Sequence, residues 1–527
     1  MFVIPWSSLC CQTQVELSSC ENLAGVILLT MGQMKWLLIL VPVGAVVGFL
    51  ILYFTGPHAT TISTLPPTPI STNQEINHNT PTQPDSSKSV SIPAPISTNA
   101  EIPTPAPTLV PAPTPKPIST PKPTASTNGT QYLVFGIPAD VYDPGKDVHG
   151  NLDKLVTSLI NRFDTTGDAK HRLGFMIVLP VWFADSRIGG NQGHVEKIIK
   201  EAFAVAKERN VAVYFTLYSF TRWPAQMWNW YDASQPGYSL ENKKNVEWTD
   251  WSGTPTKNRY SLQEGETRMT PVMCYNSSKV LSEISHITSK ILGPAILRGT
   301  ADLKSAGKED LFGGITLSEE LSLDDYSGID KLNPTLGAMM TTDGALKTRL
   351  GYCALTNLGY SKDKPPADYP AALAKVNQDY ATYWGKQLVQ AGIPKAKLYT
   401  HVAPALDAAY LQYTNAPTDT AFNEYSNPGW TTYLAGPLAN GLDVLYKALA
   451  DNGNPTWGST ESSPTNITGT SVKPETFLAW HYNHGANLIV MNAADGSAGG
   501  QGIGKSIWSS ASVAAYQKFL SGAQLQE

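Results

Sequence analysis

Acidic side chains close two short apolar stretches of this sequence. The stretch GGITLSEEL carries Glu319 and Glu320 near its end, and NPTWGSTESSP carries Glu461. Two carboxyl groups that face each other divide acid–base chemistry between them. A protonated one gives its proton to a leaving oxygen, while an ionised one attacks carbon or activates water. Cleavage of a glycosidic bond needs such a pair, so the question is whether the fold brings these glutamates together.

The elements that must position the glutamates alternate between short apolar runs and amphipathic ones. Helices are predicted at residues 152–163, 195–209, 371–391 and 442–451. Strands are predicted at 132–137, 175–181, 212–219, 313–318, 397–402, 429–433, 455–460 and 488–492. This alternation predicts an α/β fold, a (β/α)₈ TIM barrel with long loop insertions. An open doubly wound sheet is the alternative, but the Gly-rich phosphate turn typical of it does not follow the first strand.

In such a barrel, the catalytic residues come from the C-terminal ends of strands. The two acidic stretches are the fourth and seventh predicted strands, which lie on opposite walls of a ring of eight. Side chains alternate in direction along a strand, so only one of Glu319 and Glu320 is expected to face the barrel mouth. We expect Glu319 to be that residue, with Glu320 as the alternative, and Glu461 to face it.

This arrangement resembles the clan of retaining (β/α)₈-barrel glycoside hydrolases that includes β-galactosidases, cellulases and mannanases. The resemblance covers residues 129–527 and rests mainly on strand order. It implies that Glu319 is the acid/base and Glu461 the nucleophile. The clan has an asparagine directly before its acid/base, which bonds the 2-hydroxyl of the sugar. Ser318 occupies that place here.

A long segment after the third predicted strand is rich in tryptophan. Sugar rings present apolar C–H faces on which indole rings stack, so such a segment at the catalytic end of a barrel is typical of a saccharide cleft. Packing of the loop onto the barrel is the alternative role for several of these rings. The predicted substrate-binding residues are Ser318, Trp182, Arg222, Trp223, Trp228, His401, Trp430 and Asn492.

No cofactor and no metal are expected, because two carboxylates supply both the proton transfers and the nucleophile. His481 and His484 have a spacing that can bind a metal, but they precede the eighth strand, so packing or surface roles are favoured. The net charge is −5, which makes nucleic acid a poor partner. Cys274 and Cys353 are the two cysteines of the barrel region, and the sequence leaves open whether they pair or stay free thiols.

The chain before the barrel has three parts with different compositions. Residues 1–34 are expected to be a disordered lead-in. Residues 35–55 contain a long uncharged apolar run, which predicts a transmembrane signal-anchor helix, with a cleaved signal peptide as the alternative. Residues 56–128 are rich in Pro, Thr and Ser, which predicts a disordered linker. Positive charge precedes the apolar run, so the N-terminus is expected inside and residues 129–527 outside the cell.

The sequence thus predicts an extracellular, membrane-anchored glycoside hydrolase whose partner is a carbohydrate substrate. The alternative is a non-catalytic carbohydrate-binding or cell-surface protein on the same barrel scaffold. Fold alone does not separate the two, because barrels carry many functions.

Overall fold

The structure, a computed structural model, divides the chain into two units, Met1–Lys116 and Pro117–Glu527. It describes residues 26–31, 34–43, 46–54, 129–137, 141–219, 223–261, 267–318, 320–323, 325, 327–332, 334, 337–338, 347–403, 416–433, 439–465, 472–492 and 506–527.

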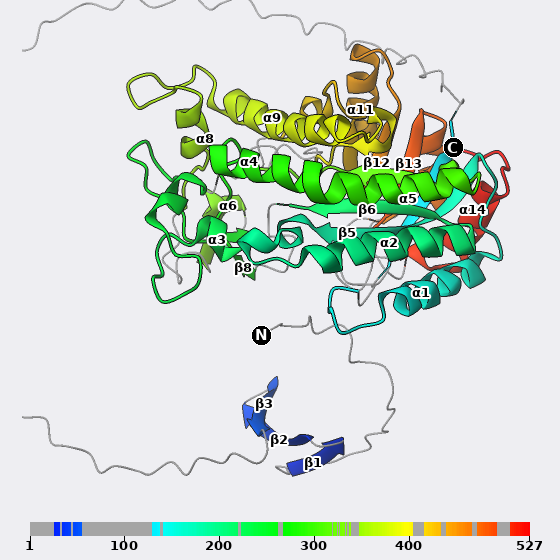
Figure 1. Ribbon diagram of the computed structural model, residues 1–527, viewed down its shortest axis with the longest axis horizontal. Coiled ribbons are helices and arrows are strands. Elements are labelled where there is room, and N and C mark those ends of the chain that lie inside the picture. Colours follow the sequence, from blue (N-terminus) through cyan, green and yellow to red (C-terminus); the bar gives the residue numbers. More distant parts are fainter. Residues whose placement is uncertain are drawn as a thin grey trace, which may run out of the picture. The chain divides into compact units, whose positions relative to one another are not determined.

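The second unit is built around one sheet of eight parallel strands (Figure 1). The strands are β4 (Gln131–Gly136), β5 (His171–Pro180), β6 (Ala212–Tyr218), β9 (Phe312–Thr316), β10 (Leu398–Tyr399), β11 (Gly429–Tyr433), β12 (Trp457–Ser463) and β13 (Ala486–Met491). All eight strands predicted from the sequence are present. β12 runs further than predicted, so Glu461 lies within this strand instead of after it.

The sheet closes into a barrel. The strand order is β10-β9-β6-β5-β4-β13-β12-β11, so each strand lies beside its neighbour in the sequence. The two outer strands of this order meet through parallel bridges that pair Tyr399 with Asn427 and Val402 with Trp430. Backbone hydrogen bonds, among them Thr431 N–H to the carbonyl of Val402 at 2.8 Å, complete the ring. The structure therefore has the (β/α)₈ architecture that the sequence predicts.

Alternate residues of the strands fill the barrel interior. Tyr132, Val134, Met176, Ala212, Tyr214, Tyr399, Leu488 and Val490 form one buried cluster there. The tyrosine hydroxyls are satisfied, since that of Tyr214 bonds Thr316 at 2.7 Å and that of Tyr399 donates to Asn487 at 3.0 Å. Gly458 makes room for Tyr399, because a Cβ at this position would lie 2.9 Å from Cδ1 of the ring. The interior is thus a packed core.

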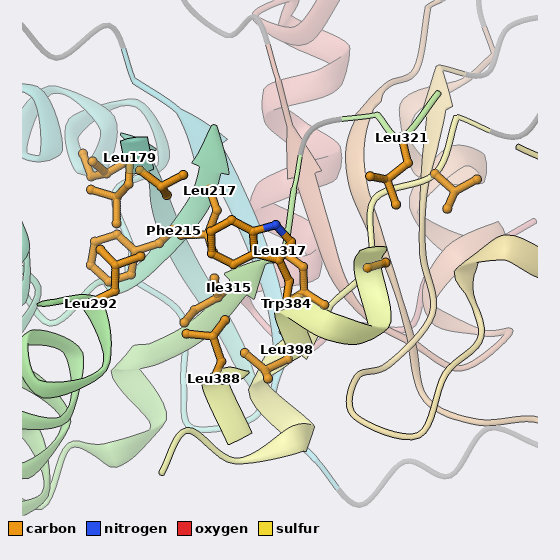
Figure 2. Close-up of a cluster of buried hydrophobic side chains, with 14 of the residues drawn as sticks. Leu179, Phe215, Leu217, Leu292, Ile315, Leu317, Leu321, Trp384, Leu388 and Leu398 are labelled. Carbon is orange, nitrogen blue, oxygen red and sulfur yellow. The ribbon is translucent and has the colours of Figure 1, made fainter. Parts of the chain in front are cut away.

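The other face of each strand packs against the helices (Figure 2). Leu179, Phe215, Leu217, Ile315, Leu317 and Leu398, from strands β5, β6, β9 and β10 and their ends, meet Leu292, Trp384 and Leu388. The helices of this layer are α1 (Val148–Phe163), α2 (Gln192–Arg209), α4 (Ser278–His286), η5 (Ile287–Leu292), α5 (Gly293–Ser305), α9 (Tyr369–Gln390), α11 (Ala439–Asp451), α12 (Pro474–Tyr482) and α14 (Ser510–Leu520). All four predicted helices are among them.

Helix boundaries follow local chemistry. The side chain of Asn191 accepts a hydrogen bond from His194 N–H and so caps the start of α2. The same helix ends at Asn210, which adopts the left-handed conformation with φ of 55°. β6 begins two residues later, so the cap sets where this strand enters the barrel.

Two long insertions follow β6 and β9. They contain α3 (Ala225–Trp228), η4 (Leu240–Lys244), β7 (Arg259–Ser261), β8 (Thr267–Met269), α6 (Ile329–Leu332) and α8 (Tyr352–Asn357). The labelled elements α3, β8, α6 and α8 gather at one end of the barrel in Figure 1. This is the end at which the strands finish, where a barrel places its reactive groups.

The described part of the first unit is a three-stranded antiparallel sheet of β1 (Val26–Met31), β2 (Met34–Val43) and β3 (Val46–Phe54). The transmembrane helix predicted over residues 35–55 is therefore not confirmed. Among the described residues, no helix is both long and apolar enough to cross a membrane. The linker predicted at 56–128 lies outside the described residues.

Candidate active site

Glu320 and Glu461 meet at the end of the barrel where the strands finish. Glu320 follows β9, the fourth barrel strand, and Glu461 projects from β12, the seventh. One oxygen of each carboxyl group and one ring nitrogen of His401 all lie within 4.8 Å of one another. The structure thus brings together acidic groups from the fourth and the seventh barrel strands. Glu319, the residue preferred from the sequence, lies outside the described residues.

Glu320 is held in an environment that favours its protonated form. Its side chain is buried, with only 9% of the residue exposed. The hydroxyl of Thr431 donates a hydrogen bond to Oε1 at 2.7 Å, while Oε2 has no hydrogen-bond partner among the described residues. Burial, reinforced by the negative charge of Glu461, raises the pKa of Glu320 to about 8. At neutral pH this residue is therefore mostly a carboxylic acid.

Glu461 has different surroundings. Its side chain is 20% exposed and accepts a hydrogen bond from the hydroxyl of Tyr433 at Oε1. Nε2 of His401 lies 3.4 Å from its other oxygen. Burial and the neighbouring charge of Glu461 raise the pKa of Tyr433 well above its usual value, so this phenol remains a donor. Glu461 is thus hydrogen-bonded and partly exposed to solvent, whereas Glu320 is buried.

His401 connects the two carboxyl groups. Its Nε2 lies 2.9 Å from the hydroxyl of Thr431, and its Nδ1 lies 3.3 Å from the carbonyl oxygen of Ser318. Burial lowers the pKa of His401 despite the nearby charge of Glu461, so the ring is neutral near pH 7. The neutral ring has one N–H group, which donates either to the Ser318 carbonyl from Nδ1 or to Thr431 from Nε2, and Thr431 donates to Oε1 of Glu320. This chain fixes the orientation of the buried acid.

Two polar residues complete the surroundings of the pair. Asn492 follows β13 and hydrogen-bonds Tyr433, the donor to Glu461. Ser318 is buried, and its hydroxyl bonds that of Ser219 at 2.9 Å. Ser318 was predicted to bind substrate, but its polar groups face Ser219 and His401. In the structure, Ser318 contacts Ser219 through its hydroxyl and His401 through its carbonyl oxygen.

The tryptophan predictions need correction. Trp182, Trp223 and Trp430 are buried at 0%, 2% and 0% exposure, so no ring face is left for a sugar. Their indole N–H groups donate to backbone carbonyls, those of Ser219, Pro271 and Thr418. These rings pack in the core and do not stack on a sugar, because a large apolar ring contributes most to the stability of the fold when it is fully buried.

Trp228 is the only predicted aromatic contact that keeps some exposure. It is half-buried, donates to the carbonyl of Trp223 at 2.7 Å and stacks on Tyr231 with ring centroids 6.0 Å apart. Arg222 lies outside the described residues. The substrate-binding roles of Trp228 and Arg222 stay predictions.

Thr431 and Tyr433 were not identified from the sequence. Both project from β11, and their even spacing places them on the same face of that strand. The strand GWTTY ends in three consecutive residues with hydroxyl groups, and alternation along a strand places the first and the third of them on one face. The sequence does not indicate that this face points toward Glu320 and Glu461, because that orientation depends on the closure of the barrel.

Glu320, His401 and Glu461 are also the described groups whose donor atoms lie near enough to contact one cation. Thr431 and Tyr433 each donate a hydrogen bond to one of the carboxyl groups, so each carboxyl group is held by a hydroxyl from β11. His481 is buried in packing contacts, with its ring nitrogens near Thr432 and the carbonyl of Phe477.

No protein-family model matches the sequence, and no curated protein matches it. Among solved structures, the chain is similar to the PgaB (BpsB) glycoside hydrolase domain from Bordetella bronchiseptica, with 13% identity over 75% of this chain and 100% of that chain and a TM-score of 0.42. It is similar to a β-1,4-mannanase from the sea hare Aplysia kurodai, with 13% identity over 74% and 93% and a TM-score of 0.37. A glycoside hydrolase family 5 enzyme from Prevotella bryantii B14 has 11% identity over 74% and 96% and a TM-score of 0.36.

Proposed function

We propose that this protein is a glycoside hydrolase in which Glu320 is the general acid/base and Glu461 the nucleophile. The observation that carries the proposal is the close approach of two carboxyl groups with different surroundings. Glycosidases that work with retention hold their carboxyl groups about 5–5.5 Å apart, and those that invert hold them roughly 6.5–9.5 Å apart. Oxygens within 4.8 Å of each other favour retention.

The first step transfers the sugar to the protein. Protonated Glu320 gives its proton from Oε2, the oxygen without a partner, to the glycosidic oxygen. The carboxylate of Glu461 attacks the anomeric carbon on the opposite face, and the bond to the leaving oxygen breaks. The products are a glycosyl ester on Glu461 and a free hydroxyl on the leaving group. Tyr433 holds the attacking carboxylate in place through its hydrogen bond.

The second step releases the sugar. Glu320, now ionised, takes a proton from water, and the resulting hydroxide oxygen attacks the anomeric carbon. The ester bond to Glu461 breaks, which restores both carboxyl groups to their starting forms. Thr431 and His401 keep Glu320 in one orientation through both steps, since the acid must act twice on the same oxygen position.

The residue before the proposed acid/base differs from that of the clan that the sequence resembles. The clan's asparagine precedes its acid/base, and with Glu320 in that role the preceding residue is Glu319. A carboxylate in place of an amide still accepts a hydrogen bond from a sugar hydroxyl but donates none at neutral pH. The substrate is proposed to be a poly- or oligosaccharide, and the preference among sugars then depends on contacts other than this amide.

We further propose that the apolar segment at 36–54 attaches the chain to a membrane and that residues 129–527 act outside the cell. The support is the run of uncharged residues after Lys35 and the Pro/Thr/Ser-rich stretch that follows. Such a stretch stays extended and would hold the barrel away from the membrane surface.

Replacement of Glu461 tests the catalytic proposal. Glu461→Gly is expected to lower kcat by at least about 10³-fold on a chromogenic aryl glycoside, because the nucleophile is gone. Added azide is expected to restore turnover by attacking the anomeric carbon in the space of the lost side chain. Glu241→Gln, at a side chain that is 78% exposed, is the matched control and keeps full activity.

Two results would count against the proposal. Full turnover by Glu461→Gly without azide removes Glu461 from the reaction. A wild-type protein that binds glycans on an array but hydrolyses no member of a broad aryl-glycoside panel supports the non-catalytic carbohydrate-binding alternative.

A further inference from the structure

Two buried cysteines lie in the insertions that follow β6 and β9. Cys274 is at the end of the insertion that follows β6, and Cys353 lies in α8, within the insertion that follows β9. Both are free thiols with 0% exposure. The two thiol groups lie close enough for each to influence the pKa of the other. About 80 residues of chain separate them, so this contact exists only because the two insertions fold against each other.

Neighbouring contacts fix the approach of the two segments. Asn357, one turn after Cys353 in α8, donates a hydrogen bond to the sulfur of Cys274 at 3.4 Å. The same side chain donates to Asn276 at 3.0 Å, and Asn276 in turn donates to the carbonyl of Ala354 at 2.8 Å. The side chains of Cys274 and Asn276 are therefore bonded directly to the helix that carries Cys353.

A buried glutamate holds the start of α8 in place. Glu247 accepts hydrogen bonds from the backbone N–H groups of Cys353 at 3.1 Å and of Ala354 at 3.3 Å. The segment that carries Glu247 also bonds Cys274, because the N–H of Cys274 donates to the carbonyl of Asn245 at 2.8 Å. Three chain segments thus meet around the two cysteines and hold them in one buried environment.

We propose that Cys274 and Cys353 form a disulfide bond when the protein folds in an oxidising compartment. The oxidant is a small-molecule disulfide such as oxidised glutathione. One protein thiolate attacks it, which forms a mixed disulfide and releases one glutathione thiol. The second protein thiolate attacks the protein sulfur of the mixed disulfide and releases the second glutathione. Two electrons pass to the oxidant, and the two thiol protons end on the two released glutathiones.

The bond forms during folding and persists afterwards. Burial raises the pKa of both thiols, so the folded protein holds little thiolate and reacts slowly. While the chain is folding, the same cysteines are accessible. Once closed, the buried bond is shielded from attack by external thiols. The proposal is independent of the glycoside hydrolase assignment.

The bond would also support the candidate active site. Tyr275, next to Cys274, donates a hydrogen bond to the carbonyl of Ser322 at 3.1 Å. Ser322 is two residues from Glu320. A covalent tie at Cys274 therefore restrains the segment that carries the buried acid.

Peptide mapping of the full chain tests the proposal directly. Protein refolded with a mixture of reduced and oxidised glutathione is denatured in iodoacetamide, digested without reductant and analysed by mass spectrometry. We expect a linked peptide containing Cys274 and Cys353 that disappears after treatment with dithiothreitol. Recovery of both cysteines fully alkylated would overturn the proposal. The mapping separates this pair from Cys10, Cys11 and Cys20.

Thermal unfolding provides a second measurement on the same material. Closing a loop of this length restricts the unfolded chain, so reduction is expected to lower the Tm by about 5 °C. In the matched variant Cys274→Ala/Cys353→Ala, the Tm is expected to be the same with and without dithiothreitol. An equal response of the variant and the wild-type protein to the reductant would overturn the assignment of the stabilising bond to this pair.

Discussion

Glu320 and Glu461 carry the same carboxyl group, but the two groups differ in burial and in hydrogen-bond partners. Glu320 is buried with one oxygen unpartnered, whereas Glu461 is partly exposed and accepts a hydrogen bond from Tyr433. Burial and the negative charge of Glu461 destabilise the ionised form of Glu320 and raise its pKa. The proposed reaction uses this difference, since it needs a protonated acid on one side of the glycosidic bond.

The pH dependence of kcat follows from Glu320. Its pKa is raised to about 8, and the protonated form is the one that donates to the leaving oxygen. In the wild-type protein, kcat is therefore expected to fall as the pH rises through about 8. In Glu320→Gln, this decrease of kcat at high pH is expected to be absent. The measurement is a pH–rate profile on a substrate with a poor leaving group, for which the variant should lose about 10²–10⁴-fold in kcat.

An aryl glycoside with an acidic phenol provides the control for this variant. Its leaving group departs without a proton, so the first step in Glu320→Gln should be affected much less. Equal losses of the two substrates in kcat/KM, which reports the first step, would contradict the role of Glu320 as general acid.

At the scale of elements, the site depends on strands that present alternate residues to the barrel mouth. β11 contributes Thr431 and Tyr433 from one face, while the residue between them, Thr432, bonds Ser459 on the neighbouring strand. A slip of one residue in this strand would exchange the two faces and remove both hydroxyls from the carboxyl pair. The packing inside the barrel holds that register.

Gly458 offers a test of the packing that holds the strands. In Gly458→Ala the added Cβ would lie 2.9 Å from the ring of Tyr399 and 3.1 Å from Leu488. Overpacking at a buried position is expected to lower the free energy of unfolding by about 1–3 kcal/mol, measured by urea denaturation. Gly129→Ala, where the new Cβ meets nothing within 4 Å, is the control and should stay within about 0.5 kcal/mol. Equal effects of the two substitutions would contradict this account.

At the scale of the whole molecule, the chain joins a barrel to an apolar N-terminal segment. We expect the full chain to sediment with membranes, to remain there after a wash with alkaline carbonate and to be extracted by detergent. Deletion of residues 1–54 is expected to release the protein to the supernatant, because the uncharged run is then absent. The measurement is immunoblotting of the fractions. Identical fractionation of the two forms would argue against an anchor in this segment.

The periodicity of the sequence was sufficient to predict the eight strands and to locate Glu461 on the seventh of them. Strand and helix patterns are local, so the eight strands and their order were readable from spacing alone. Glu461 was located because it belongs to the seventh strand. The tryptophans were misjudged, since a side chain such as Trp182 or Trp430 has the same letter whether it lines a cleft or fills a core.

The sequence by itself predicted eight strands alternating with helices, with acidic residues at the ends of the fourth and the seventh strands. Only the tertiary structure decided that Glu320 meets Glu461, that His401 and Thr431 orient the acid, and that Tyr433 donates to the carboxylate. The physical reason is that direction and burial of a side chain after a strand depend on neighbours distant in the chain. The protonation of Glu320 follows from those neighbours as well, since it requires removal of water and a charge brought from another strand.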